Sequence, residues 1–331
     1  MLTATLVIIL CTVAIWWCSE QLAHGTSVIG RVYRIPAGVR GATLDAVASS
    51  FPELCSVVFA LIAGHFGAGV GVIAGSALFN ILVIPALVSL AVGGVTVRSG
   101  VIKRDGLLYV AVVIAFIVIF YLGAPGEAEG FRRLSPWTGA GAIVLYAGYV
   151  LALILQARSK PEDGPGTEPV EGGAEPQDGD SVPASVGRIL IGMAGVGVAC
   201  HFLVNYGLQL TELLGFSPAV AGVTVLAAAT SLPDTLLSVF AARRGDADGA
   251  IANAFASNTF DILICLGLPV LISGGLELNW NQGWPVLACL LISTLTAVML
   301  MITDWKITRG ESLFKLGLYF AFCAAIFAGW L

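Results

Sequence analysis

The stretch that decides the fold runs from Leu226 to Pro269 and reads LAAATSLPDTLLSVFAARRGDADGAIANAFASNTFDILICLGLP. Most of its residues are apolar or small, as expected of membrane helices. Polar residues nevertheless fall inside the two helices that it predicts, among them Thr230, Ser231, Asp234, Asn253, Ser257, Asn258 and Asp261. Because a charged side chain at the centre of a bilayer costs several kcal/mol, carboxylates at that depth indicate a functional site.

The same pattern occurs once more, over residues 45–82. A constant offset of 181 aligns this segment with the first stretch without a gap, and 12 of the 38 aligned positions are identical. Glu53 falls on Asp234 in this alignment, and Asn80 falls on Asp261. The chain therefore contains an internal repeat, and both copies place polar groups in apolar surroundings.

The composition indicates the fold class. The chain has 331 residues, of which 57% are hydrophobic and only 11% are charged. Many apolar runs reach the roughly 20 residues that cross a hydrocarbon core. The seven cysteines lie scattered through these runs without CxxC spacing, which predicts packing residues rather than disulfides or a zinc site. We predict an all-α polytopic membrane protein with ten transmembrane helices, at residues 2–18, 42–65, 68–96, 107–123, 137–157, 185–211, 217–242, 247–273, 284–303 and 312–331.

The basic residues predict the orientation. Of the 16 Lys and Arg residues, all but Arg132 and Arg133 lie in or beside the odd-numbered connections between helices. The positive-inside rule then places both termini on the non-cytoplasmic side. No Lys or Arg precedes the first span, so we expect a retained helix rather than a cleaved signal peptide. Such a chain, without large insertions, fits a prokaryotic inner (cell) membrane.

The two copies of the repeat begin five crossings apart, and an odd number of crossings makes them antiparallel across the membrane. We therefore predict two inverted-topology five-helix halves, 1–158 and 184–331, with repeats at about 42–96 and 217–273. Inverted repeats of this kind are typical of secondary transporters. Residues 159–183 are rich in Pro, Gly, Glu and Asp and are predicted to form a disordered acidic cytoplasmic linker.

The polar residues of both copies suit hard cations. Pro52 and Pro233 are each expected to break a helix beside a carboxylate and to free backbone carbonyls. Carboxylate, hydroxyl and carbonyl oxygens are ligands for Ca²⁺ or Na⁺ and are unsuited to Zn²⁺ or Cu²⁺. Up to three carboxylates would repel one another unless cations or protons neutralise them, which favours exchange of one cation for another. Five glycines of the first copy are expected to permit close helix contact: Gly64, Gly67, Gly69, Gly71 and Gly75.

These motifs resemble the alpha repeats of the sodium/calcium exchanger superfamily. The family pattern is roughly Gly-Thr-Ser-x-Pro-Glu/Asp, followed on the next helix by Gly-Ser-Asn-x-Phe-Asn/Asp. The corresponding motifs here are ASSFPE at 48–53, GSALFN at 75–80, ATSLPD at 229–234 and ASNTFD at 256–261. Three details look most like the potassium-dependent sodium/calcium exchangers: GSALFN, SNTFDI followed by GLP at 267–269, and KRD at 103–105.

The resemblance implies a set of metal ligands. Glu53 and Asp234 would be the central carboxylates, with Asn80 and Asp261 flanking them. In potassium-dependent members the positions that match Asn258 and Asp261 are tied to potassium. The implied hydroxyl ligands are Ser50, Ser76, Ser231 and Ser257, and Ser49 and Thr230 would support them. The implied backbone carbonyls lie near Ala46 and Ala227.

The chain also departs from the family pattern. Ala48, Ala229 and Ala256 stand where the motifs carry glycine, which reduces backbone freedom. Val72 and Ala77 stand where other branches carry Asn, so the first copy has fewer amide ligands. We expect these departures to affect gating kinetics and ion stoichiometry.

These features together predict a secondary active antiporter that exchanges Na⁺ for Ca²⁺ by alternating access, with K⁺ co-transport left open. The helices at 2–18 and 185–211 would slide only when the site is filled. A Ca²⁺/H⁺ or other cation antiporter on the same scaffold is the alternative. An intramembrane aspartyl protease and a channel are more remote, and the chain lacks the GxGD motif of the protease. The expected partners are Ca²⁺, Na⁺ and the lipid bilayer; no enzyme activity, cofactor or nucleic acid is expected, and homo-oligomerisation is left open.

Overall fold

The computed structural model of the protein describes residues 1–35, 37–159 and 181–328. Within these ranges it contains ten helices that are long and apolar enough to cross a membrane, which confirms the predicted number. Helix α7 ends at Ser159 and α8 begins at Val182. Most of the predicted linker at 159–183 therefore lies outside the described residues.

Several spans are interrupted by a π-helical turn, labelled η. In chain order the spans are α1 (Leu2–Val32); α2 (Ala37–Arg40), η1 (Gly41–Asp45) and α3 (Ala46–Ile62); α4 (Phe66–Val92); α5 (Ser99–Val101), η2 (Ile102–Gly106) and α6 (Leu107–Leu122); α7 (Pro136–Ser159); α8 (Val182–Leu213); α9 (Pro218–Ala221), η3 (Gly222–Leu226), α10 (Ala227–Thr230) and α11 (Leu232–Arg243); α12 (Ala247–Phe260), η4 (Asp261–Cys265) and α13 (Gly267–Ile272); α14 (Trp280–Asp304); and α15 (Arg309–Phe327). Single π-helical turns are rare in proteins overall, and those that are found often lie at functional sites.

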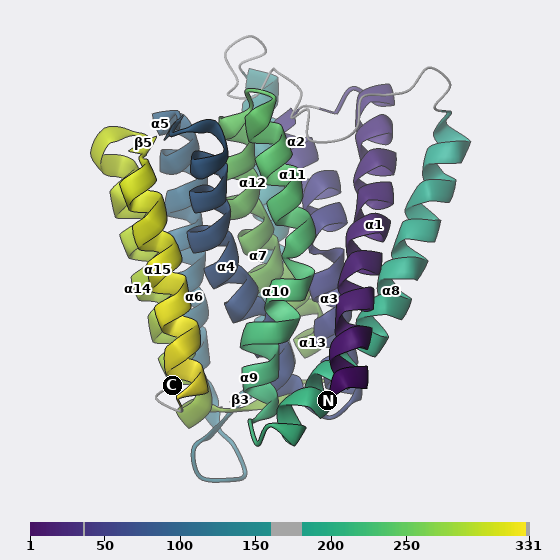
Figure 1. The fold of residues 1–331 in the computed structure, drawn as a ribbon, viewed down its shortest axis with the longest axis vertical. Coiled ribbons are helices and arrows are strands. Elements are labelled where there is room, and N and C mark those ends of the chain that lie inside the picture. Colours follow the sequence, from purple (N-terminus) through teal and green to yellow (C-terminus); the bar gives the residue numbers. More distant parts are fainter. Residues whose placement is uncertain (36, 160–180, 329–331) are drawn as a thin grey trace.

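The two halves run in opposite directions through the bundle. Figure 1 shows the span of α2 and α3 starting at the upper end, whereas the matching span of α9, α10 and α11 starts at the lower end. Both chain termini lie at the lower end. This arrangement is the inverted ten-helix architecture that the repeat predicts.

The helices that carry the repeat motifs form the centre of the bundle. The buried share of the most apolar 18 residues differs from span to span. This share is 89% in α4 and 72% in the span of α12 and α13, but only 17% in α7. Outer helices leave large apolar side chains exposed, as expected of a surface that faces lipid. The polar residues of the repeats are therefore removed from both lipid and water.

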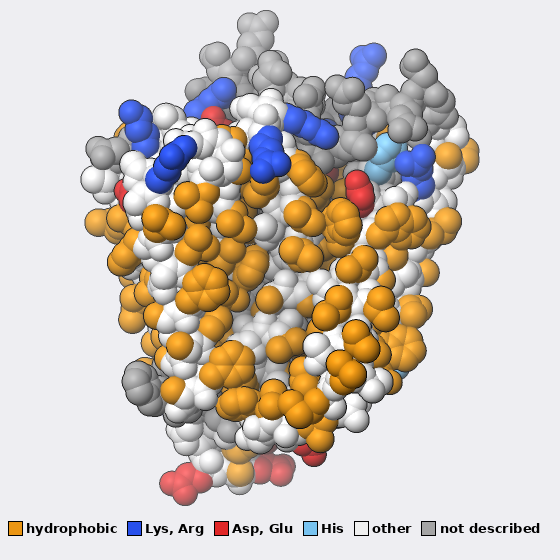
Figure 2. Space-filling view, viewed as in Figure 1, with side chains coloured by type: hydrophobic (Ala, Val, Ile, Leu, Met, Phe, Trp, Pro, Cys, Tyr) orange, Lys and Arg blue, Asp and Glu red, His pale blue; other side chains and the backbone are white. Residues whose placement is uncertain are grey.

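On the face that Figure 2 shows, charged side chains lie towards the two ends of the molecule. Lys and Arg side chains lie along the upper end together with a few Asp and Glu, other Asp and Glu side chains lie at the lower end, and apolar side chains cover most of the surface between them (Figure 2). The basic end is opposite the end that holds both termini. This distribution agrees with the loop charges read from the sequence.

Close approach of the two repeats depends on glycine at two positions of α4. A Cβ atom on Gly71 would lie 2.8 Å from the carbonyl oxygen of Ala219, and one on Gly75 would overlap the carbonyl oxygen of Val223. Gly64 and Gly67 have nothing within 4 Å of such an atom, so the predicted close contact is wrong there. Gly64 instead serves the turn before α4, where its φ is +78°.

Two predicted spans are longer than expected. Helix α1 continues to Val32 instead of ending at 18, since polar residues such as Ser19 and Thr26 are buried in the bundle rather than exposed to solvent. The fourth span begins at Ser99 instead of 107. Its charged turn is accommodated because Arg104 pairs with the buried Asp105 at 2.7 Å.

The expected helix break is present in only one of the two repeats. Helix α3 continues through Pro52, so the predicted break at this residue is wrong. In the second repeat α10 ends at Thr230, Ser231 has a ψ of −2°, and α11 starts beside Pro233. An N–H group in the first turn of a helix has no partner within the helix, so a proline there costs no hydrogen bond. This explains why the new helix begins at this point.

Short antiparallel strands, which the sequence did not predict, close the two ends of the bundle. Strand β1 (Val95–Thr96) pairs with β5 (Lys306–Ile307). At the other end, β3 (Phe131–Leu134) pairs with both β2 (Ala124–Pro125) and β4 (Leu276–Asn279). These strands tie connections of the first half to connections of the second.

Candidate ion-binding site

Every residue of the predicted ligand set is buried at the centre of the bundle. Exposure is 0% for Glu53 and Asp261 and 1% for Asp234. The helices α3, α4, α10, α11 and α12 contribute the set, together with Ser231 between α10 and α11 and the first residue of η4. Its other members are also buried: Ala46, Ser49, Ser50, Ser76, Asn80, Ala227, Thr230, Ser231, Ser257 and Asn258.

Two pairs of serines join the repeats across the centre. Ser50 Oγ lies 2.8 Å from Ser257 Oγ, and Ser76 Oγ lies 2.7 Å from Ser231 Oγ. The offset of 181 converts one pair into the other, so the same contact is made twice. The site therefore has an internal twofold symmetry that matches the repeat.

Each serine pair also reaches a carboxylate. Ser76 Oγ donates to Glu53 Oε1 at 3.2 Å, and Ser257 Oγ donates to Asp234 Oδ2 at 3.0 Å. These bonds are again equivalent under the offset. Ser231 Oγ lies 3.5 Å from Glu53 Oε1 and adds a longer contact.

The predicted carbonyl ligands are held by the supporting hydroxyls. Ser49 Oγ donates to the carbonyl of Ala46 at 3.3 Å, and Thr230 Oγ1 donates to the carbonyl of Ala227 at 3.2 Å. The side chain of Thr230 also lies beside the carboxylate of Glu53 from the other repeat. Hydroxyls of both repeats thus lie beside each central carboxylate.

The twofold symmetry is lost at the two asparagines. Asn80 Nδ2 donates to Asn258 Oδ1 at 3.0 Å, and Asn258 Nδ2 donates to the carbonyl of Ala77 at 3.2 Å. Both polar atoms of the Asn258 amide are therefore engaged by protein groups, whereas Asn80 Oδ1 has no hydrogen-bond partner. This geometry gives Asn80 a free ligand atom and assigns Asn258 to its support; direct ligation by Asn258 stays a prediction.

Each of the three carboxylates keeps one oxygen without a hydrogen-bond partner: Glu53 Oε2, Asp234 Oδ1 and Asp261 Oδ2. Electrostatic interactions link Glu53 to both aspartates. In the described part of the chain none of them forms an ion pair, and no three His, Cys, Asp or Glu side chains come close enough to hold one metal ion. A cation here would draw on one or two carboxylates together with hydroxyl, amide and carbonyl oxygens, a set that suits Ca²⁺ or Na⁺.

Two cysteines contact this site, although the sequence predicted only packing roles for them. Cys265 Sγ lies 3.6 Å from Asp261 Oδ1 and 3.7 Å from the carbonyl of Ser50. Cys200 Sγ lies 3.5 Å from the carbonyl of Pro52. The four-residue spacing from Asp261 to Cys265 could have indicated the first contact, whereas the sequence holds no comparable signal for Cys200.

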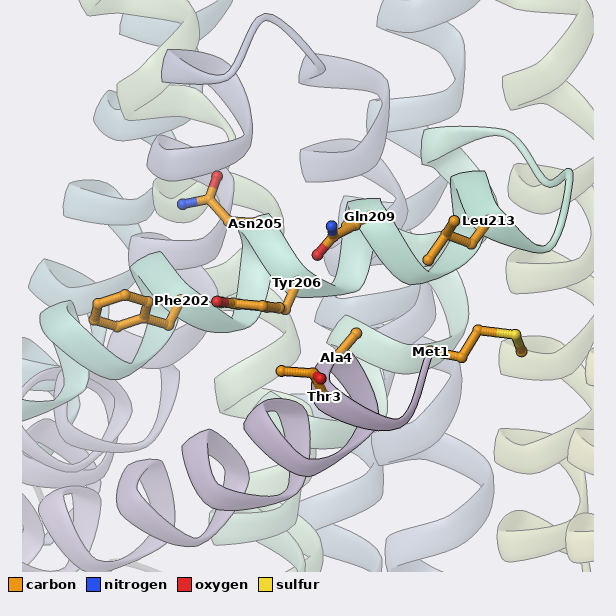
Figure 3. A pocket seen from close by; sticks show the side chains of 8 residues that line it. All are labelled: Met1, Thr3, Ala4, Phe202, Asn205, Tyr206, Gln209 and Leu213. Atoms are coloured by element: carbon orange, nitrogen blue, oxygen red, sulfur yellow. The ribbon is translucent and has the colours of Figure 1, made fainter.

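A separate pocket of about 750 Å³ lies between the start of α1 and the end of α8 (Figure 3). Asn205, Tyr206 and Gln209 line it from α8, and Thr3 and Ala4 line it from α1. None of the candidate ion ligands is among its lining residues. The candidate ligands therefore lie in the packed centre of the bundle and not in this pocket.

The comparisons with known proteins agree with this geometry. The sodium/calcium exchanger protein family matches residues 3–155 and 184–328, which include both repeats and all ten spans. The chain belongs to this family. As a member of a family of cation/Ca²⁺ antiporters it is a transporter, and the protease considered above is set aside.

Relatives and solved structures match the chain over nearly its full length. The inner membrane protein YrbG of Escherichia coli K12 is 28% identical over 330 residues, which cover 99% of this chain and 98% of that protein. A structure of the sodium-calcium exchanger NCX_Mj, soaked with Na⁺ and Sr²⁺, is 25% identical with a TM-score of 0.65 and covers 97% of this chain and 98% of its own. The protein is thus an integral multi-pass membrane protein with the exchanger fold.

The resemblance to potassium-dependent exchangers covers less of the chain. Sodium/potassium/calcium exchanger 2 of Mus musculus is 31% identical over 134 residues, which are 38% of this chain and 20% of that protein. The similarity is thus partial, in contrast to the full-length matches.

Proposed function

We propose that this protein exchanges Na⁺ for Ca²⁺ across a cell membrane by alternating access. The symmetric contacts of Ser50 with Ser257 and of Ser76 with Ser231, each leading to a carboxylate, carry this proposal. They place hard oxygen atoms from both repeats around one buried centre. These oxygen atoms suit Ca²⁺ or Na⁺.

Charge balance supports exchange over simple binding. Glu53, Asp234 and Asp261 are fully buried and interact with one another electrostatically, yet they form no ion pair in the described residues. Burying uncompensated charges is strongly unfavourable. One Ca²⁺ or several Na⁺ would compensate them, so each ion can replace the other while an empty site resists movement through the membrane.

The packing of α1 against α8 supports the proposed motion. A Cβ atom on Gly25 would lie 2.8 Å from the carbonyl oxygen of Ser185, and one on Gly192 would lie 2.8 Å from that of Cys18. The two helix backbones are therefore in close contact along much of their length. We propose that they slide together as one unit across the site when ions fill it.

We further propose that residues 1–158 and 184–331 act as the two inverted halves. In the proposed orientation the basic end of Figure 2 faces the cytoplasm, and both termini lie on the opposite side. The E. coli relative is named an inner membrane protein, which supports the same location for this chain. The linker at 159–183 would then be cytoplasmic.

The test is Ca²⁺ uptake into sealed liposomes that contain the purified protein and are loaded with Na⁺. Sodium, potassium and pH gradients are varied one at a time. We expect uptake to require internal Na⁺. Uptake driven by a pH gradient without Na⁺ would instead support a Ca²⁺/H⁺ antiporter, and a further rise with external K⁺ would add potassium as a co-transported ion.

A pair of variants links this activity to the site. Glu53→Gln removes a central charge and is expected to abolish sodium-driven uptake. Glu129→Gln makes the same chemical change at an exposed carboxylate outside the bundle and is expected to behave like the unmodified protein. Normal exchange by Glu53→Gln would contradict the proposed role of the buried carboxylates.

A further inference from the structure

One side of the ion-binding centre carries sulfur. The Cys265 thiol is completely buried, and its Sγ lies 3.6 Å from Asp261 Oδ1 and 3.7 Å from the carbonyl oxygen of Ser50. Asp261 and Cys265 are the first and last residues of the π-helical turn η4. The thiol thus contacts a carboxylate of one repeat and the backbone of the other.

A second observation marks this position as a ligand site rather than a packing contact. Asp261 Oδ2 is fully buried and has no hydrogen-bond partner, although the other oxygen of the same carboxylate contacts the thiol. Buried carboxylate oxygens are normally satisfied by a donor or a cation. A cation held by Asp261 and the Ser50 carbonyl would therefore lie within reach of the sulfur atom.

The sulfur is present on only one side of the pseudo-twofold axis. The offset of 181 places Cys265 on Ile84, whose side chain is also completely buried but has no ligand atom. The side of the centre around Asn80, the counterpart of Asp261, thus has no sulfur, while the Asp261 side combines oxygen with sulfur. The two sides should differ in their preference for soft cations.

We propose that Asp261, Cys265 and the Ser50 carbonyl form a binding site for a soft divalent cation of about the size of Ca²⁺, with Cd²⁺ as the representative ion. Thiolate sulfur binds soft and borderline metals in preference to Ca²⁺ or Na⁺. The thiol loses its proton to solvent as the sulfur–metal bond forms, so one proton is released for each ion bound through this sulfur. The proposal rests on the same buried centre as the proposed exchange, and Cd²⁺ would compete with Ca²⁺ for Asp261.

The other cysteines provide matched controls. All seven are free. Cys200 is equally buried and also contacts a backbone carbonyl, that of Pro52, but it forms no hydrogen bond to a carboxylate among the described contacts. Cys289 lies half-buried on α14, outside the two repeats in the sequence. Replacement by serine at each position exchanges the sulfur for a hydroxyl oxygen and changes the side-chain shape little.

The experiment titrates the purified full-length protein in detergent with Cd²⁺ and records the ultraviolet charge-transfer absorption of the cadmium–thiolate bond together with proton release. We expect both signals in the unmodified protein and in Cys200→Ser and Cys289→Ser. Both should be lost in Cys265→Ser and in a second variant, Cys265→Ala, provided that each elutes as folded protein. Excess Ca²⁺ should suppress the absorption.

Transport gives the second readout. The concentration of Cd²⁺ that halves Ca²⁺ uptake, measured against each variant's own uptake, should rise at least tenfold in Cys265→Ser and stay unchanged in Cys289→Ser. Persistence of the charge-transfer absorption in Cys265→Ser, or in excess Ca²⁺, would overturn the proposal. Because the spectroscopic titration needs no transport, a failure of sodium-driven uptake with an intact cadmium signal would count against the proposed function alone.

Discussion

Replacement of Gly75 by alanine tests how closely the two repeats must pack. In the structure a Cβ atom at this position would overlap the carbonyl oxygen of Val223 and lie 2.7 Å from the Cβ of Ala227. The first of these atoms belongs to the backbone and the second is bonded directly to it, so no flexible side chain can move aside. Helix α4 would have to separate from η3 and α10.

The expected loss of stability has two causes: overpacking at Gly75, and stretching of the hydrogen bonds between the repeats when the helices separate. Overpacking a close-packed core costs about 1–3 kcal/mol. The neighbouring residue Ser76 makes the 2.7 Å contact with Ser231, and loss of a buried hydrogen bond adds about 0.5–1.5 kcal/mol. We expect Gly75→Ala to destabilise the protein by about 1.5–4.5 kcal/mol on these figures and to weaken ion binding as well.

Gly67→Ala is the matched control on the same helix. Nothing lies within 4 Å of its added Cβ, and alanine is favoured over glycine in a helix by about 1 kcal/mol. Thermal unfolding of both variants in detergent, with Ca²⁺ uptake in liposomes, measures the difference. Equal unfolding temperatures for Gly75→Ala and Gly67→Ala would refute the view that the repeats are in backbone contact at Gly75.

Three further outcomes are expected. Ser257→Ala leaves Asp234 Oδ2 without its 3.0 Å hydrogen bond. A penalty of about 1–3 kcal/mol for the lost bond predicts roughly tenfold weaker Ca²⁺ affinity in uptake assays. Unchanged affinity would exclude this bond from the site. Thr308→Ala removes the capping box of α15 and should cost about 1 kcal/mol in thermal unfolding with exchange retained; loss of exchange would contradict a purely structural cap. Arg98→Ala breaks the exposed 2.9 Å ion pair with Asp248 and should change the free energy of unfolding by less than about 1 kcal/mol. A large drop in the unfolding temperature would contradict this expectation.

The sequence alone predicts the candidate site well because its chemistry is local. Each motif places a hydroxyl and a carboxylate or amide within about one helix turn, and the repeat supplies a second copy at a constant offset. These residues are buried together in the structure, although their roles as ligands stay predictions. The contact of Cys265 with the Ser50 carbonyl was not predicted, because it joins residues 215 positions apart.

The sequence by itself determined the number of spans, their opposite directions in the two halves and the identity of the polar residues at the centre. Hydrophobic length, loop charge and an internal repeat are sufficient for this, since each is a property of neighbouring residues or of a fixed offset. Only the tertiary structure decided which side chains meet: Ser50 with Ser257, Ser76 with Ser231, and Asn258 with the carbonyl of its counterpart Ala77. It also decided that α3 continues through Pro52 while its counterpart breaks at Ser231. These features depend on how the two halves pack against each other, and no local pattern in either half contains that information.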